Sequence, residues 1–174
     1  MYRNSVAAAA DVTFDDVTLA SLPLAELINA PDLGVANVVA EIEIAVNPAG
    51  TQAGLAIGWD SQAAPANGIL IYHDGSNVKI DKNVAGTWTA VQSTATAFSA
   101  NAKLKCHRDG SSVSVFYNNA LIGATQTISD AAILAGTRHG AFSTAATGTM
   151  DKALIFPRKT TYDGALNRWS GARP

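Results

Sequence analysis

The sequence predicts an all-β fold, a two-sheet antiparallel jelly-roll sandwich. Short segments alternate apolar and polar residues, and turn signals separate them roughly every 8–12 residues, as in sandwiches and barrels. The 174 residues are 48% hydrophobic, which is enough to bury one core. No segment keeps a helical apolar period over three turns, and the nearest, LASLPLAELINA, is interrupted by Pro23. We expect the sandwich to span residues 1–157 and a C-terminal extension to span residues 158–174.

Two early strands follow from alternation alone. In VVAEIEIAV, the residues expected to face inward are Val38, Ala40, Ile42, Ile44 and Val46. The glutamates between them, Glu41 and Glu43, are expected to face outward. In AGLAIGW, the same period places Leu55, Ile57 and Trp59 on one face.

The segment GILIYHDGSNVKID predicts a hairpin. A two-residue turn at Asp74-Gly75 is favoured because both central residues need a positive φ. The pairs that follow on the apolar face are Ile71 with Val78 and Ile69 with Ile80, and those on the outer face are Tyr72 with Asn77 and Leu70 with Lys79.

The segment KLKCHRDGSSVSVFYNNALIG predicts a three-stranded meander. A turn at Asp109-Gly110 pairs Cys106 with Val113, and a turn at Asn118-Asn119 pairs Phe116 with Leu121. The inner face then carries Leu104, Cys106, Val113 and Val115, and the outer face Lys103, Lys105, His107, Ser112, Ser114 and Phe116. Cys106 is the only cysteine and is expected to be buried and unreactive. RHGAFSTA and MDKALIF are further strand candidates.

The segments AGLAIGWDSQAAPANGILIYHDGSNVKIDKNVAGTWTAV and FSANAKLKCHRDGSSVSVFYNNALIGATQTISD together resemble the concanavalin A-like lectin/glucanase superfamily, in particular its laminin G-like domains. The resemblance covers roughly residues 36–156, and VTFDDVTLAS resembles the opening strand of that family. It implies a jelly roll of two antiparallel sheets. Such domains include lectins, glycan-binding modules, glycosidases, adhesion domains and virion surface proteins, so the fold does not select a function.

A catalytic role in glycoside cleavage would depend on carboxylates. The glucanase branch places three acids in the pattern E-x-D-x-x-E, and Glu41 with Glu43 resembles its first two positions. Val46 and Asn47 stand where the third acid is required. Alternating glutamates are also typical of a half-exposed strand. We therefore expect no catalytic residues and no enzymatic activity.

Composition disfavours several other classes of partner. Charged residues make up 15% of the chain and the net charge is −2, which disfavours nucleic-acid binding. No apolar run approaches the ~20 residues of a membrane helix. MYRNSVAAAADVTF lacks a leucine-rich core, so no signal peptide is recognised.

No cofactor is expected, apart from calcium as a weaker hypothesis. Some relatives bind calcium, and the first and last strands of such sandwiches often lie together. The candidate oxygen ligands are Asp11, Asp15, Asp16 and Asp151. The alternative is that these residues belong to turns and strand edges.

A glycan site requires aromatic faces with polar partners for hydroxyl groups. The candidates are Tyr72, Asn77, Lys79, Trp88, Lys105, His107 and Phe116. The alternatives are that Trp88 is a packing residue and that Phe116 with Leu121 is one cross-strand pair.

The extension after Pro157 suggests assembly. Its candidate contact residues are Arg158, Tyr162, Arg168, Trp169 and Arg173. Trp169 would anchor it on a neighbouring subunit, because aromatic and Arg side chains dominate interface hot spots. The alternative is that the extension folds back over its own sandwich.

Together, the resemblance, the extension and the absence of a recognised export signal favour a non-catalytic structural or adhesion module of a large assembly. We expect a phage-like virion decoration, tail or fibre-associated protein, located on a virion or extracellular surface. Its partners would be other protein subunits and a surface glycan. The alternative is a free lectin-like carbohydrate-binding module, and the third hypothesis is a glycoside-active enzyme.

Overall fold

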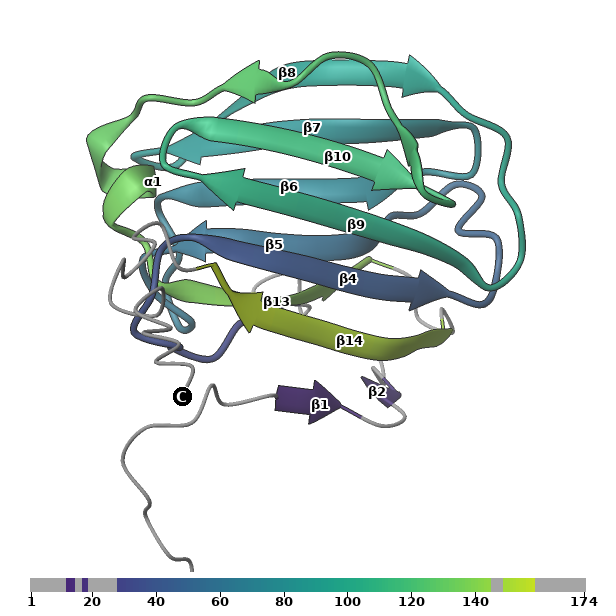
Figure 1. Cartoon of the computed structure of the whole chain (residues 1–174), viewed down its shortest axis with the longest axis horizontal. Coiled ribbons are helices and arrows are strands. Elements are labelled where there is room, and N and C mark those ends of the chain that lie inside the picture. Colours follow the sequence, from purple (N-terminus) through teal and green to yellow (C-terminus); the bar gives the residue numbers. More distant parts are fainter. Residues whose placement is uncertain (1–11, 15–16, 19–27, 145–148, 159–174) are drawn as a thin grey trace, which may run out of the picture.

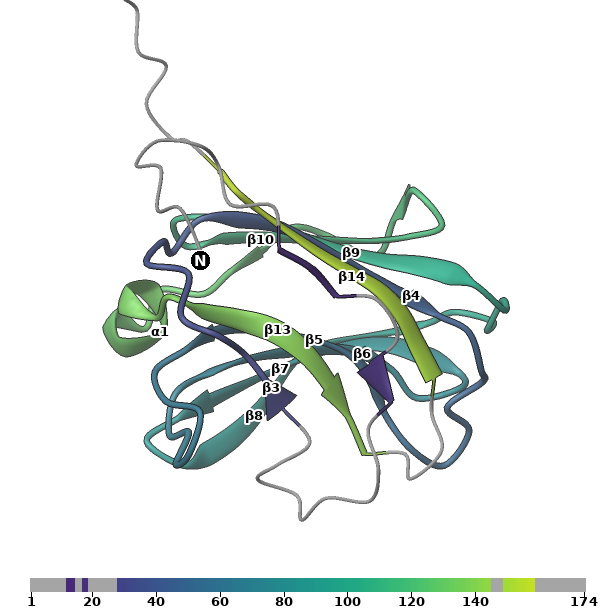
Figure 2. The same cartoon turned by 90° about the horizontal axis from the view of Figure 1, so that it is seen from below.

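The computed structural model describes residues 12–14, 17–18, 28–144 and 149–158. They form two antiparallel sheets that face each other, which confirms the predicted jelly-roll sandwich (Figure 1). In Figure 2 the two sheets are seen as separate layers, with α1 at one end between them.

The eight-stranded sheet has the order β1-β14-β4-β9-β10-β11, with β2 paired to β14 and β12 to β10. Its strands are β1 (Val12–Phe14), β2 (Val17–Thr18), β4 (Val38–Ile44), β9 (Ala102–Asp109), β10 (Ser112–Tyr117), β11 (Ala120–Leu121), β12 (Gln126–Thr127) and β14 (Thr149–Pro157). The predicted strands RHGAFSTA and MDKALIF correspond to β13 (Arg138–Ser143) and β14.

The six-stranded sheet has the order β3-β13-β5-β6-β7-β8. Its strands are β3 (Ile28–Asn29), β5 (Ala53–Trp59), β6 (Gly68–His73), β7 (Asn77–Val84), β8 (Thr87–Ala95) and β13 (Arg138–Ser143). The single described helix, α1, spans Ala131–Ala135. No helix in the described ranges is long and apolar enough to cross a membrane.

One main core fills the space between the sheets. Its members include Val38, Ala40, Ile42, Ile44, Leu55, Ile57, Ile69, Ile71, Leu104, Cys106, Val113 and Val115, as the alternation predicts. Cys106 is fully buried, and this burial raises the pKa of its thiol to about 12. Val46 was expected on the same face, but β4 ends at Ile44 and Val46 is 50% exposed.

Both Asp-Gly turns lie one residue later than predicted, which shifts the strand pairing by two residues. The central residues are Gly75-Ser76 and Gly110-Ser111, so that Asp74 and Asp109 precede the turn instead of forming it. Asp74 Oδ1 accepts hydrogen bonds from the N–H groups of Ser76 and Asn77, at 3.0 and 2.7 Å. This local bonding favours the observed turn.

The corrected pairs are Ile71 with Ile80, Tyr72 with Lys79, Leu70 with Asp81, Cys106 with Val115 and Leu104 with Tyr117. Because the pairing shifts by two residues, the side chains of these two hairpins keep their predicted faces. The Asn118-Asn119 turn is confirmed, with φ of 49° and 66° and with Phe116 opposite Leu121.

Trp59 lies on the opposite face from the one predicted. Gly58 has a φ of 66° and forms a bulge, where β5 pairs Trp59 with Arg138 but Ile57 with His139. The extra residue turns Trp59 away from Leu55 and Ile57 and onto the outer face of the six-stranded sheet.

Arg108 was not predicted to have a role, yet it is fully buried. Its guanidinium donates hydrogen bonds to the carbonyls of Ile133, Leu134 and Gly136, at 2.6, 3.0 and 3.2 Å. These groups lie at the C-terminal end of α1, where carbonyls lack helical partners. The inward register of Arg108 beside Cys106 is the signal that could have found it.

Candidate functional site

The predicted glycan residues are divided between the two sheets. Tyr72, Asn77, Lys79 and Trp88 belong to β6, β7 and β8 of the six-stranded sheet. Lys105, His107 and Phe116 belong to β9 and β10 of the eight-stranded sheet. The sheets face each other, so these two groups lie on opposite sides of the molecule (Figure 2).

The outer face of the six-stranded sheet contains a cavity of about 260 Å³. Its lining is Ile28, Gln52, Leu70, Tyr72, Asp81, Trp88, Phe142 and Thr144. Leu70, Tyr72 and Phe142 are almost completely buried and form the floor. Trp88 is 49% exposed and forms an open wall. The cavity therefore combines an apolar, partly aromatic surface with a few polar groups.

Trp88 is supported by Trp59. The ring centroids lie 6.0 Å apart with an interplanar angle of 53°, and Trp59 is only 1% exposed. Trp59 crosses Gly68 so closely that a Cβ there would lie 2.6 Å from the indole ring. The indole N–H of Trp59 also donates to the Ile69 carbonyl at 3.1 Å. One ring is thus fixed in the protein while the other is presented to solvent.

Tyr72 and Asp81 form the polar centre of the cavity. The Tyr72 hydroxyl donates a 2.5 Å hydrogen bond to Asp81 Oδ2, and the Phe142 ring contacts Tyr72 edge-on at 6.0 Å. Burial, followed by the adjacent carboxylate, raises the pKa of Tyr72 well above its ordinary value. Among the described residues, no hydrogen-bond donor reaches Asp81 Oδ1. This oxygen can therefore accept a hydrogen bond from a ligand.

A second, more open cavity of about 530 Å³ lies beside the first and shares Gln52 and Thr144 with it. Its lining is Gly50, Thr51, Gln52, Asp74, Ser76, Asn77, Lys79 and Thr144. Lys79 forms a 2.7 Å ion pair with Asp74. Burial acts to raise the pKa of Asp74, but hydrogen bonds from Lys79, Ser76 and Asn77 hold it well below its ordinary value. All four predicted residues of this sheet therefore line one of two adjoining cavities.

Several residues of these cavities were not predicted from the sequence. Asp81 could have been found, because it alternates with Lys79 on the outer face of β7. Gln52 and Thr144 precede β5 and follow β13, and no periodic pattern marks them. Phe142 pairs with Gly54, a contact that depends on the sheet order.

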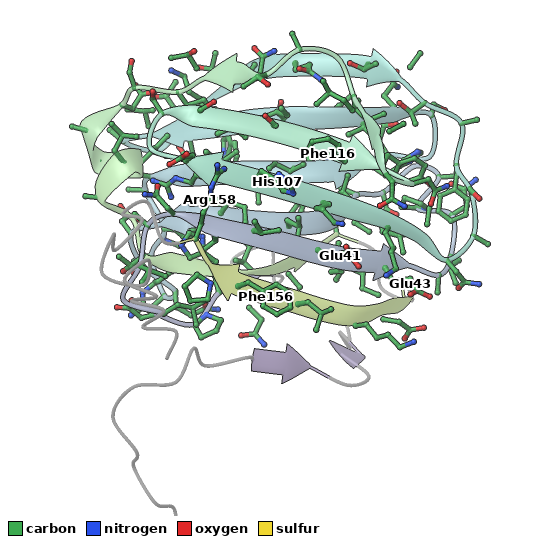
Figure 3. The ribbon with its side chains drawn as sticks, in the orientation of Figure 1. Glu41, Glu43, His107, Phe116, Phe156 and Arg158 are labelled. Carbon is green, nitrogen blue, oxygen red and sulfur yellow. The ribbon has the colours of Figure 1, made fainter. Side chains whose placement is uncertain are left out.

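The other predicted residues lie on the outer face of the eight-stranded sheet, which faces the viewer in Figure 3. The rings of His107 and Phe116 lie 4.8 Å apart, and Phe116 is directly opposite Leu121. The predicted alternative, a cross-strand pair of Phe116 and Leu121, is therefore present. Burial, then Lys105 and Arg158, lowers the pKa of His107.

Glu41 forms ion pairs of 2.8 Å with both Lys103 and Lys105 on the same face. Partial burial acts to raise the pKa of Glu41, but the hydrogen bonds and charges of the two lysines hold it below its ordinary value. A glycosidase acid requires a raised pKa, so this environment is unsuited to that role. Figure 3 shows Glu43 further along the same strand.

Of the proposed calcium ligands, only Asp151 lies within the described residues, where it pairs with Glu43 across β14 and β4. Asp11, Asp15 and Asp16 lie outside them. In the described part of the chain, no three His, Cys, Asp or Glu residues are grouped to hold a metal ion. Calcium binding stays a prediction.

Of the predicted assembly residues, Arg158 is described. It pairs with Asp109 at 3.2 Å, and its backbone N–H donates to the Asn37 carbonyl at 2.8 Å. Tyr162, Arg168, Trp169 and Arg173 lie outside the described residues. The assembly hypothesis therefore stays a prediction.

Comparison with known proteins gave matches among solved structures. No protein-family model matches the chain. No curated protein matches it either. The carbohydrate-binding module CBM40 of the Ruminococcus gnavus IT-sialidase, bound to α2,3-sialyllactose, matches at 10% identity and a TM-score of 0.53, over 86% of this chain and 94% of that one. Galectin LEC-6 of Caenorhabditis elegans matches at 14% identity and a TM-score of 0.51, over 82% and 94%.

Enzyme structures also match, but over a small part of their length. The xylan β-1,4-xylosidase of Bacillus halodurans C-125 matches at 11% identity and a TM-score of 0.54, over 84% of this chain and 32% of that one. The chain likewise spans only 31% of the GH43 protein BlXynB of Bacillus licheniformis. At these identities the likeness shows the fold alone. The protein has the concanavalin A-like jelly-roll fold that its sequence resembles.

Proposed function

We propose that this protein is a non-catalytic, lectin-like carbohydrate-binding module that holds a sugar on the outer face of its six-stranded sheet. The observation that carries the proposal is the exposed ring of Trp88, backed by buried Trp59 and adjoining the Tyr72–Asp81 pair. Sugar rings present apolar C–H faces and hydroxyl edges. An aromatic wall beside a carboxylate and an amide offers contacts for both.

Two structural relatives described above that match over nearly their whole length, a carbohydrate-binding module and a galectin, support the same interpretation. They favour the carbohydrate-binding alternative over the virion hypothesis, since neither is a virion protein. The chain corresponds to less than a third of the length of the matching xylosidase. The ion-paired state of Glu41 adds a chemical argument for a binding role without catalysis.

The dimensions of the two cavities favour an oligosaccharide over a single sugar. The cavity beside Trp88 has about 260 Å³, and the polar cavity beyond Gln52 and Thr144 has about 530 Å³. An oligosaccharide whose first sugar ring lies on Trp88 would extend toward Asn77 and Lys79. These two side chains then supply polar contacts to the following sugar.

The test is binding of Trp88→Ala to a glycan array, with Phe116→Ala as the matched control. Both variants shorten a partly exposed aromatic side chain, but on opposite sheets. We expect Trp88→Ala to weaken binding about tenfold or more, because stacked aromatic anchors carry a large share of such affinities. Phe116→Ala should bind like the native protein. Equal binding by native protein and Trp88→Ala would contradict the proposed site.

A further inference from the structure

The charge in the proposed site indicates which class of sugar it accepts, an inference that rests on the proposed function. Asp81 is the single charged residue among the described residues that line the 260 Å³ cavity. No described lysine, arginine or histidine lines that cavity beside it. A ligand on Trp88 therefore meets a negative charge that no described residue of this cavity balances.

The lysine that lines the adjoining cavity is already paired with a carboxylate. Lys79 lines the adjoining cavity, but its ammonium lies 2.7 Å from Asp74 Oδ2. Recruiting Lys79 for an acidic sugar would break this pair and leave the Asp74 carboxylate without its lysine. The described lining of the adjoining cavity therefore offers no surplus positive charge.

The hydrogen-bonding groups of the cavity also favour an uncharged ligand. The Tyr72 proton is already donated to Asp81 Oδ2, which leaves Tyr72 without a proton for an anion. Asp81 Oδ1 is an acceptor that can take a proton from a sugar hydroxyl. Such a bond to a carboxylate is charge-assisted and short. A sugar carboxylate in the same place would bring two like charges together in a partly desolvated site.

We propose that the site selects uncharged sugars and rejects carboxylated ones, such as uronic and sialic acids, and that Asp81 makes this selection. The solved carbohydrate-binding module of the Ruminococcus gnavus sialidase is bound to sialyllactose, an acidic sugar. The present site would thus differ in ligand class from a protein of the same fold. Like-charge repulsion at a few ångströms in a partly buried site corresponds to a preference of about tenfold or more for neutral sugars.

The experiment uses pairs of a neutral and an acidic saccharide, of which two pairs differ only in a hydroxymethyl group or a carboxylate and the third in an added sialic acid. β-1,4-linked gluco-oligosaccharides are compared with β-1,4-glucurono-oligosaccharides, β-1,4-mannan with mannuronan, and lactose with sialyllactose. The full chain is applied to an array of these pairs at neutral pH. We expect binding to the neutral member of at least one pair and about tenfold weaker binding to its acidic counterpart.

The selecting residue is tested with Asp81→Asn, which keeps the shape and an acceptor oxygen for Tyr72 but removes the charge. This variant should bind neutral sugars more weakly than the native protein, because the charge-assisted bond becomes a neutral one. The ratio of neutral to acidic binding should fall from about tenfold toward one, and this ratio is the quantity that tests the role of Asp81. Asp109→Asn, the same charge change on the other sheet, should leave discrimination intact.

Three results distinguish a failure of this inference from a failure of the proposed function. Equal or stronger binding of acidic members by the native protein would overturn the inference while leaving the proposed function standing. Unchanged discrimination in Asp81→Asn would also overturn it, because another group would then select the ligand. Absence of binding to every sugar on the array would contradict the proposed function itself.

Discussion

The backbone N–H of Gly58 donates a 3.2 Å hydrogen bond to Nδ1 of His139 on the neighbouring strand. The other ring nitrogen of His139, Nε2, lies 2.8 Å from the Val35 carbonyl and donates to it. This tautomer is neutral, with one nitrogen accepting and the other donating. The imidazole therefore supports the bulge at Gly58, and this bulge turns Trp59 toward the proposed binding face.

The first prediction is a loss of stability in mild acid. His139 is fully buried, and burial lowers its pKa to about 4. Between about pH 6.5, the ordinary value, and pH 4, the unfolded imidazole binds a proton and the folded one does not. The free energy of unfolding therefore falls as the pH falls through this window, by at most about 3 kcal/mol from this residue. Urea unfolding at pH 7 and pH 4.5 measures the change.

The matched variant is His139→Gln, because a glutamine can accept from Gly58 and donate to Val35 without titrating. We expect a shallower pH dependence in this variant than in the native protein. The burial-lowered pKa of His73 leaves a second contribution of the same sign in both proteins. An identical pH dependence of the two would show that His139 is protonated alike in the folded and unfolded states.

The outcome for Trp59 shows why the site could be predicted only in part. Alternation along β5 gave the right face for Leu55 and Ile57, because apolar burial repeats every two residues. A single bulge at Gly58 reverses the alternation. The sequence does not show whether a glycine in a strand forms a bulge or continues the regular strand. The aromatic pair of Trp59 and Trp88 therefore depends on a backbone feature that periodicity does not contain.

The two Asp-Gly turns show which part of a hairpin can be predicted from the sequence. The predicted register was two residues off, yet the faces survived because the side-chain period is two. For this reason Tyr72 and Lys79 were correctly placed on the outer face. The division of the predicted glycan residues between two sheets could not be predicted without the strand order. One sheet carries Tyr72, Asn77, Lys79 and Trp88, and the other carries Lys105, His107 and Phe116. Strand order is set by long-range packing, which local turn chemistry does not specify.

The second prediction concerns buried Arg108. Replacing it by Met removes its hydrogen bonds to the carbonyls of Leu134 and Gly136, and leaves the Ile133 carbonyl with the Gly136 N–H as its donor. We expect the free energy of unfolding to fall by about 2–4 kcal/mol. Chemical denaturation measures this change.

Arg138→Met is the control for that experiment. Its 3.9 Å pair with Asp32 is substantially exposed, so the loss should be within about 0.5 kcal/mol. Similar losses in the two variants would mean that the bonds from Arg108 to the end of α1 add no more stability than a surface contact.

The third prediction concerns Glu41. Glu41→Gln removes the charge that pairs with Lys103 and Lys105 on the outer face of the eight-stranded sheet. We expect a loss of stability of about 1 kcal/mol or less, because the pairs are partly exposed. Sugar binding should be unchanged, because the proposed site is on the other sheet. Thermal unfolding and the glycan array give the two measurements.

The same variant tests the non-catalytic reading. Native protein and Glu41→Gln are incubated with polysaccharides, and reducing ends are measured over time. We expect neither to release products. Hydrolysis by the native protein that disappears in Glu41→Gln would make the third hypothesis, a glycoside-active enzyme, the correct one.

The last prediction concerns the C-terminal extension. A chain truncated after Arg158 should keep its fold, because the core residues from Val38 to Ile155 and the β14 pairing through Pro157 precede the cut. Circular dichroism and thermal unfolding should match the full chain. If Trp169 anchors a contact between subunits, light scattering should show that the full chain assembles and the truncated chain does not. Losing a Trp and several Arg contacts is expected to weaken association by about 2–4 kcal/mol, roughly 30- to 1000-fold.

The single change Trp169→Ala distinguishes an anchor from a general effect of the extension, and should reproduce most of the loss. Unfolding of the truncated chain would show that the extension belongs to the sandwich and would support the alternative in which it folds back on its own domain. Unchanged assembly after truncation would place the subunit contacts elsewhere on the sandwich. A full chain that stays monomeric at micromolar concentration would contradict the assembly hypothesis and leave the carbohydrate site as the proposed interaction surface.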